Sequence, residues 1–166
     1  METLVKVSKA FVLFVQAIRL GGCIGDYSGG GAMPSASGIQ GEKATFGFYI
    51  HAGNDGLDCN NITSASGDFQ FVDHGTGVNV AFHAVILDSA GGFADADENF
   101  APIFLADYYV KGKKAGQVLV GAMDYGKTKK TDNIFVMVLD GPFAGYLNTG
   151  IFEKGNVTYT PDPLCQ

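Results

Sequence analysis

The chain has 166 residues, of which 46% are apolar, and this share is enough for a packed core and excludes a disordered chain. The formal net charge is −6 and there is no basic tract, which excludes the electrostatic footprint of a nucleic-acid-binding protein. Glycine fills 24 positions, about twice its usual share of roughly 7%, and the length suits one domain with or without a tail.

Residues 1–22 have the order of features found in an export signal. Lys6 and Lys9 precede an apolar run over 10–18, and the small residues of Leu-Gly-Gly-Cys follow at 20–23. A positively charged region, a short apolar region and a small-residue cleavage site define such a signal. The Leu-Gly-Gly-Cys sequence also resembles the bacterial lipobox, in which the cysteine becomes the lipidated first residue of the mature chain. We therefore expect Cys23 to be a lipid-attachment residue.

An alternative interpretation of the same segment stays open. Arg19 puts a charge between the apolar run and the cleavage site, where signal peptides are normally neutral. The segment also fits an ordinary amphipathic helix, because its apolar residues fall on one face: Val7, Phe11, Phe14, Val15 and Ile18. If the export interpretation holds, the protein is secreted or sits at the cell surface, and it contacts a membrane only through the lipid.

The segment 23–41 is rich in glycine, serine and alanine. Such a composition is typical of a flexible linker. We therefore expect a tether that holds the following domain off a surface.

The three cysteines fit export in one of two ways. Lipidation of Cys23 would leave Cys59 and Cys165 as an even pair, able to form a disulfide in an oxidising compartment. The alternative is three unrelated thiols, buried or free. No two of them have the spacing of metal ligands, so we expect no zinc site.

Apolar and polar residues alternate with a period of two in the segments 43–51, 66–73 and 78–87. Such alternation predicts strands with one face in water. Turn residues then separate five further short segments with strand character, at 103–111, 115–125, 132–139, 146–152 and 155–160. About eight short strands of this kind predict an all-β domain over 42–166, built as an antiparallel β-sandwich or jelly roll.

Several short motifs are similar to those of a known group of domains. They are Gly29-Gly30-Gly31, Pro34-Ser35-Ala36, Lys43-Ala44-Thr45-Phe46-Gly47-Phe48, Phe69-Gln70-Phe71-Val72-Asp73-His74 and Gly155-Asn156-Val157. With these motifs the chain resembles exported, glycine-rich bacterial all-β domains of the type GGGW…GKATFGF, often called post-COAP-like. Ala32 stands where those domains have tryptophan. The resemblance covers 29–159 and implies an exported β-rich protein with no settled activity and no catalytic residues.

The acidic segment 95–99 is a candidate calcium site. Asp95, Asp97 and Asn99 place oxygen atoms at alternate positions of a loop. Calcium is a hard cation that prefers such ligands. An EF-hand is excluded, because Phe100 occupies the position of its required glycine. The alternative to a structural calcium ion is a solvated acidic loop.

His51, Asp68 and His83 form a second candidate metal site. If the strands that contain them pair as antiparallel neighbours, the two histidines arrive near Asp68. Two imidazoles and a carboxylate can hold a divalent ion, and they would support a metal-dependent enzyme or hydrolase. The alternative is a pair of solvent-facing histidines on the polar side of a sheet. No nucleophile elbow or activated thiol is recognisable, so no catalytic residue is assigned.

These observations lead to one main interpretation and two alternatives. We expect a non-catalytic secreted or surface-anchored module that binds a protein or a glycan, with calcium as the one candidate cofactor. Exposed aromatic side chains at the rim of the domain would suit such binding. The first alternative is a small metal-dependent enzyme or hydrolase that uses His51, Asp68 and His83. The second is a subunit that polymerises through its edge strands.

Overall fold

The computed structural model describes residues 25–53, 64–86, 89–94, 100–124 and 132–163. Within this part of the chain, no helix is long and apolar enough to cross a membrane. The described residues form a short 3-10 turn, η1 (Gly141–Phe143), and ten strands: β1 (Gly25–Pro34), β2 (Lys43–Gly53), β3 (Ser64–Asp73), β4 (Asn79–Ile86), β5 (Ser89–Ala94), β6 (Phe100–Val110), β7 (Lys113–Met123), β8 (Asn133–Val138), β9 (Leu147–Ile151) and β10 (Lys154–Pro161).

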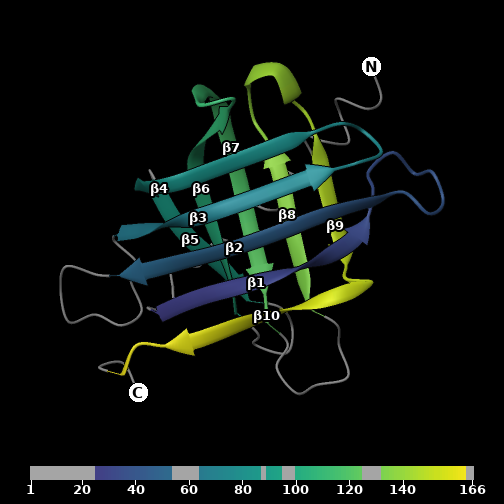
Figure 1. Ribbon diagram of the computed structural model, residues 1–166. Coiled ribbons are helices and arrows are strands. Elements are labelled where there is room, and N and C mark those ends of the chain that lie inside the picture. Colours follow the sequence, from purple (N-terminus) through teal and green to yellow (C-terminus); the bar gives the residue numbers. More distant parts are fainter. Residues whose placement is uncertain (1–24, 54–63, 87–88, 95–99, 125–131, 164–166) are drawn as a thin grey trace.

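All ten strands belong to one antiparallel sheet. Its order is β10-β1-β2-β3-β4-β6-β7-β8-β9, and β5 pairs with β6 beside this path. The sheet curls, so that β10 and β1–β4 form a front layer while β6–β9 cross behind it at a steep angle (Figure 1). The result is a half-barrel. The expectation of an antiparallel all-β domain is confirmed.

The sheet turns from one layer to the other at β4 and β5. β4 pairs with β3 over most of its length, but with β6 only where Ala81 meets Tyr109. β5 then pairs with β6 along the whole of Ser89–Ala94. Because β7 occupies the other edge of β6, β4 and β5 share a single edge. The chain thus passes between layers in the way that strands do at the corners of orthogonally packed sheets.

The core lies between the two layers and follows from the alternating sequence. In β2, Phe46 and Phe48 are buried, whereas Tyr49 between the strand's inward residues is exposed. Rings of the two layers meet in the middle, as Tyr27 of β1 and Phe104 of β6 show, with centroids 6.1 Å apart. Burial of each large apolar side chain contributes about 1.5–3 kcal/mol. The inner face of the sheet is therefore what holds the layers together.

Each of the eight predicted strands is present, with its ends shifted by at most a few residues. β1 and β5 are additional strands that the sequence pattern does not predict. β5 contains Gly91 and Gly92 in its middle, and glycine is depleted in strands, so its sequence does not indicate one.

β1 replaces most of the flexible tether that the composition of 23–41 predicts. It is an interior strand, paired with β2 on one side and with β10 on the other. A Cβ at Gly31 would lie 2.3 Å from the carbonyl oxygen of Lys154, and a Cβ at Gly29 would lie 2.9 Å from the ring of Phe48. These glycines therefore allow close packing of neighbours. The prediction of a tether is wrong for residues 25–34.

Candidate functional site

The front layer has one face in the core and one face in solvent, which we call the outer face. Polar and small residues on the outer face are aligned in rows across the strands. Three rows cross β10, β1, β2 and β3: Thr160, Asp26, His51 and Ser66; then Thr158, Ser28, Tyr49 and Asp68; then Asn156, Gly30, Gly47 and Gln70. Because packing uses the inner face, the outer face carries the candidate functional groups of the described residues.

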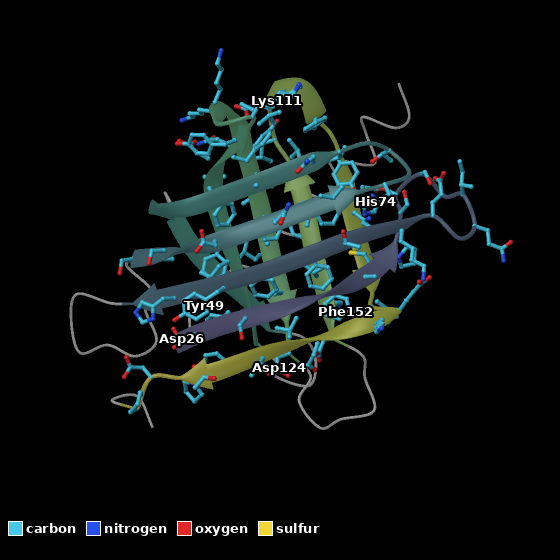
Figure 2. All side chains as sticks on the ribbon, viewed as in Figure 1. Asp26, Tyr49, His74, Lys111, Asp124 and Phe152 are labelled. Atoms are coloured by element: carbon cyan, nitrogen blue, oxygen red, sulfur yellow. The ribbon has the colours of Figure 1, made fainter. Side chains whose placement is uncertain are left out.

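Asp26 lies beside Tyr49 of β2 on the outer face (Figure 2), and its carboxylate contacts both Tyr49 and His51. The Tyr49 hydroxyl donates a hydrogen bond to Asp26 Oδ1 at 2.8 Å, and His51 Nδ1 lies 2.9 Å from the same oxygen. The hydrogen bond from His51, and then that from Tyr49, lowers the pKa of Asp26. The same carboxylate raises the pKa of Tyr49. Since a carboxylate only accepts, His51 Nδ1 carries the ring hydrogen and Nε2 is the acceptor nitrogen of the neutral ring.

The partnership of His51 with Asp26 was not predicted from the sequence. The glycine content around Asp26 predicts a tether, and a tether has no fixed neighbour. A signal was nevertheless present, because Asp26 and Ser28 flank the apolar Tyr27 with the period of two that marks a strand. The position of His51 on the polar face was predictable, but its partner required the pairing of β1 with β2.

Asp68 and His83 occupy neighbouring strands. Asp68 lies in a bulge of β3, between the pair Phe69–Phe82 and the pair Gly67–Val85, so its backbone faces residues 83 and 84 of β4. The side chain of His83 is outside the description. In the part of the chain that is described, no three His, Cys, Asp or Glu side chains form a group that could hold a metal ion.

Six other predicted site residues lie outside the described ranges. They are Cys23 for the lipid, Cys59 and Cys165 for the disulfide, and Asp95, Asp97 and Asn99 for calcium. Lipid attachment, the disulfide and the calcium ion therefore stay predictions.

Two hollows adjoin on the outer face. One, of about 260 Å³, is lined by Thr45, Phe46, Gly47, Gln70 and Val72. The other, of about 580 Å³, has Gln70, Asn79, Tyr109 and Lys111 as its polar lining, together with Ala81, Val110 and Gly112. Because Gln70 belongs to both, the hollows are adjacent and follow one another across β2, β3, β4 and β6. We call the pair of hollows the outer groove.

Lys111 marks one end of the outer groove, at the turn between β6 and β7 (Figure 2). Lys111 and Gly112 form a two-residue hairpin loop with φ values of 52° and 75°. Positive φ at both positions is the geometry of a type I′ turn, in which Asn, Asp or Gly is usual. A lysine with positive φ is uncommon and adds some backbone strain.

Asp73, the last residue of β3, is the centre of a buried network. Its carboxylate accepts hydrogen bonds from five groups: Ser35 Oγ, Tyr146 Oη and the backbone N–H groups of Ala36, Gly75 and Thr76. Burial opposes ionisation, but the hydrogen bonds from Ser35 and Tyr146 and from the backbone outweigh it and lower the pKa of Asp73 to about 2. The network joins three connections of the chain, and its role is structural.

Two aspartates close one edge of the sheet. β10 pairs with β1 alone. On its other side, the N–H of Val157 donates to Asp132 Oδ2 at 2.8 Å, and the N–H of Tyr159 donates to Asp124 Oδ2 at 3.0 Å. Figure 2 shows Asp124 beneath this strand. The carboxylates occupy donors that an incoming strand would need, which opposes edge-to-edge association.

The outer face thus offers two features that a ligand could meet: the cluster of Asp26, Tyr49 and His51, and the outer groove. The first is open, with the side chains of Asp26 and His51 44% and 50% exposed. The second is concave and has amide, hydroxyl and ammonium groups in its lining. Comparison of the chain with known protein families, with curated proteins and with solved structures finds no match.

Proposed function

We propose that the protein is an exported, non-catalytic binding module that holds a glycan on the outer face of its sheet. The observation that carries this proposal is the outer groove, whose polar lining consists of Gln70, Asn79, Tyr109 and Lys111. Concave sites with a few convergent polar groups are where ligands bind preferentially. Amide side chains match the hydroxyl groups of a sugar, and a tyrosine offers an apolar ring face with a polar end.

A glycan suits this surface better than a protein does. The groove crosses interior strands, whose backbone groups pair with one another, so an extended peptide finds no free edge there. At the β10 edge, where a peptide strand would add, Asp124 and Asp132 occupy backbone donors. The exposed Tyr49, 49% accessible, and the hydroxyl groups of the second row extend the polar surface beside the groove.

Retention on immobilised polysaccharides tests the proposal. We expect the purified chain to be retained by at least one polysaccharide, and Gln70→Ala to reduce retention about tenfold, the effect of losing about 1.4 kcal/mol. Ile39→Ala is the control, because Ile39 is exposed but lies away from the groove in the turn before β2. A folded chain that binds a protein through the outer face and no glycan would overturn the proposal.

Export is the second part of the proposal and rests on the sequence of residues 1–23. β1 begins at Gly25, so a lipid on Cys23 would bring the start of β1 close to the membrane. The intact mass of the protein from its native host would reveal cleavage before Cys23, a lipid and a Cys59–Cys165 disulfide together. A mass equal to the unprocessed chain would contradict export through this signal.

Three finer expectations remain within the proposal. They are the resemblance to exported glycine-rich bacterial domains, the description of the curled sheet as a sandwich or jelly roll, and a structural calcium ion at Asp95, Asp97 and Asn99. Metal analysis of the native protein tests the ion, with one calcium per chain as the supporting result and none as the contrary one.

The hydrogen bond between Asp26 and His51 favours a second candidate function, hydrolysis. Ser66 follows His51 in the same row, and an aspartate that orients a histidine beside a serine is an arrangement used in nucleophilic catalysis. In the metal-dependent form of this candidate, His51, Asp68 and His83 would hold the ion. Hydrolysis of p-nitrophenyl acetate, with and without added zinc, should be lost in His51→Ala and kept in Ser28→Ala. Equal background rates for all three proteins would remove this candidate.

A further inference from the structure

The larger hollow of the outer groove has the size and the lining of a ligand site. Its volume of about 580 Å³ falls within the roughly 300–1,000 Å³ usual for such sites. Gln70 and Asn79 come from neighbouring strands, and Tyr109 enters from the back layer where Ala81 alone joins β4 to β6. The hollow thus lies where the two layers separate, and its polar groups come from three strands.

Lys111 supplies the positive charge of this hollow. Asp107, four positions earlier in β6, is paired with Lys114. Among the described residues, Lys111 has no ion pair, and it is exposed at the end of the hairpin. An ammonium group beside amide and phenol groups favours a ligand that carries both an anionic group and hydroxyl groups.

Gly47 pairs with Gln70 on the outer face, and because it has no side chain the surface of the sheet is recessed there. This is a second observation, independent of the hollow itself, that points to a ligand site. A Cβ at this position would meet no atom within 4 Å, and the φ angle of Gly47 is not in the left-handed region. Neither packing nor backbone geometry therefore requires glycine here, although glycine within a strand lowers stability by roughly 0.5–1 kcal/mol relative to alanine. Glycine inside a strand often marks a bulge, a tight bend or a place where a ligand or another backbone approaches closely, and the pairing of β2 with β1 and β3 has no register shift at Gly47.

The groove is long enough for several units of a chain. From Gly47 to Tyr109 the aligned residues cross four strands, and with neighbouring strands about 4.8 Å apart this spans roughly 14 Å. The groove runs across the strands, so a bound chain lies over side chains and leaves the backbone pairing intact.

We propose that the outer groove binds an extended acidic polysaccharide, with a uronate carboxylate paired to the Lys111 ammonium and sugar hydroxyls bonded to Gln70 and Asn79. This inference rests on the proposed glycan-binding function and names its ligand class. The ring of Tyr109 covers one face of a sugar unit, and the space over Gly47 takes the units that follow.

Calorimetric titration with a galacturonic acid trimer and with a neutral galactose trimer tests the ligand class. We expect the uronate trimer to bind at least tenfold more tightly at low salt, and the difference to shrink as salt rises. Lys111→Gln should weaken uronate binding about tenfold. Lys154→Gln, which removes an exposed lysine of β10 outside the groove, should not.

Gly47→Thr tests the position of the site. A Cβ at this position meets no atom within 4 Å and threonine is favoured in strands, so stability in urea should stay equal or rise. The added side chain occupies the groove, so uronate binding should fall at least tenfold. Ser66→Thr adds a methyl group to the first row and should keep binding. Retained binding in folded Gly47→Thr would overturn the placement of the site.

The remaining outcomes separate the inference from the function it rests on. Equal affinity for the two trimers, with no effect of Lys111→Gln, would overturn the uronate assignment and leave glycan binding in place. Failure of the chain to bind either trimer or any immobilised polysaccharide would overturn both.

Discussion

Gly29 and Gly31 of β1 and Gly47 in the middle of β2 lie in the same sheet, but packing requires the first two and does not require the third. On the inner face, a Cβ at Gly31 would press against the backbone of Lys154, and one at Gly29 against the ring of Phe48. On the outer face, a Cβ at Gly47 would meet nothing. The inner glycines are needed for the strands to approach each other, whereas the fold does not need Gly47. The two faces therefore tolerate substitution very differently.

Adjacent residues of β3 should show the largest difference between the faces. Phe69 is buried and stacks on Phe82 with centroids 5.3 Å apart, while Gln70 is exposed. We expect Phe69→Ala to lower the free energy of unfolding by about 4 kcal/mol, because it leaves a cavity. Gln70→Ala should change it by less than about 0.5 kcal/mol. Urea unfolding measures both, and similar losses would contradict the assignment of the faces.

The next largest difference in stability is expected between alanine substitutions at Gly31 and at Gly47. Gly31→Ala should destabilise by about 3 kcal/mol, since the methyl group forces β10 away from β1. Gly47→Ala should stabilise by about 0.5 kcal/mol, because alanine restricts the unfolded chain and meets no obstacle. Thermal unfolding of the two variants side by side is the measurement. A stable Gly31→Ala variant would mean that β10 is free to shift.

Lowering the pH should reduce the stability of the protein through the buried Asp73 and hardly at all through the exposed Asp26. The pKa of Asp73 is about 2 in the folded protein against 3.8 ordinarily, so the unfolded state binds more protons and stability falls as the pH drops from about 4 to 2. The loss is about 2 kcal/mol. Asp73→Asn should flatten this part of the pH profile. Asp26→Asn should leave it almost unchanged, because Asp26 is solvent-exposed and its hydrogen bonds are screened.

The smallest expected effect is at the β10 edge of the sheet, where Asp124 and Asp132 accept backbone hydrogen bonds. Asp132→Ala would leave the buried N–H of Val157 without its acceptor, at a cost of about 1–2 kcal/mol. The double variant Asp124→Ala/Asp132→Ala should also self-associate through β10, which sedimentation at increasing concentration would detect. A variant that stays monomeric would show that the carboxylates do not protect this edge, and would weaken the case against polymerisation.

Three of the strands, β2, β3 and β4, could be predicted from their period of two, which is a local property, and five others from short segments of strand character between turn residues. Phe46, Phe48 and Ile50 alternate with polar residues or glycine, and this order alone indicates a buried face and a wet face. β1 escaped prediction because its glycines have the composition of a linker. Their actual role depends on Lys154 and Phe48, which are distant in the sequence and become neighbours only when β10 and β2 flank β1.

The candidate site was predictable to a similar extent. Alternation places Tyr49 and His51 on the polar face of their strand. The partner of His51 depends on the register between β1 and β2, and the groove depends on the single Ala81–Tyr109 pair between β4 and β6. Register is set by the whole sheet, so no local pattern identifies Asp26 or unites Gln70 with Lys111.

By itself the sequence determined the all-β class, the positions of eight strands and, for the alternating segments 43–51, 66–73 and 78–87, the division into an inner and an outer face, because alternation is a local property. Only the tertiary structure decided that the strands form one curled sheet, that the glycine-rich segment 25–34 is an interior strand, and that a groove crosses the outer face. These features depend on contacts between residues far apart in the chain, and such contacts exist only after the sheet has closed around its core.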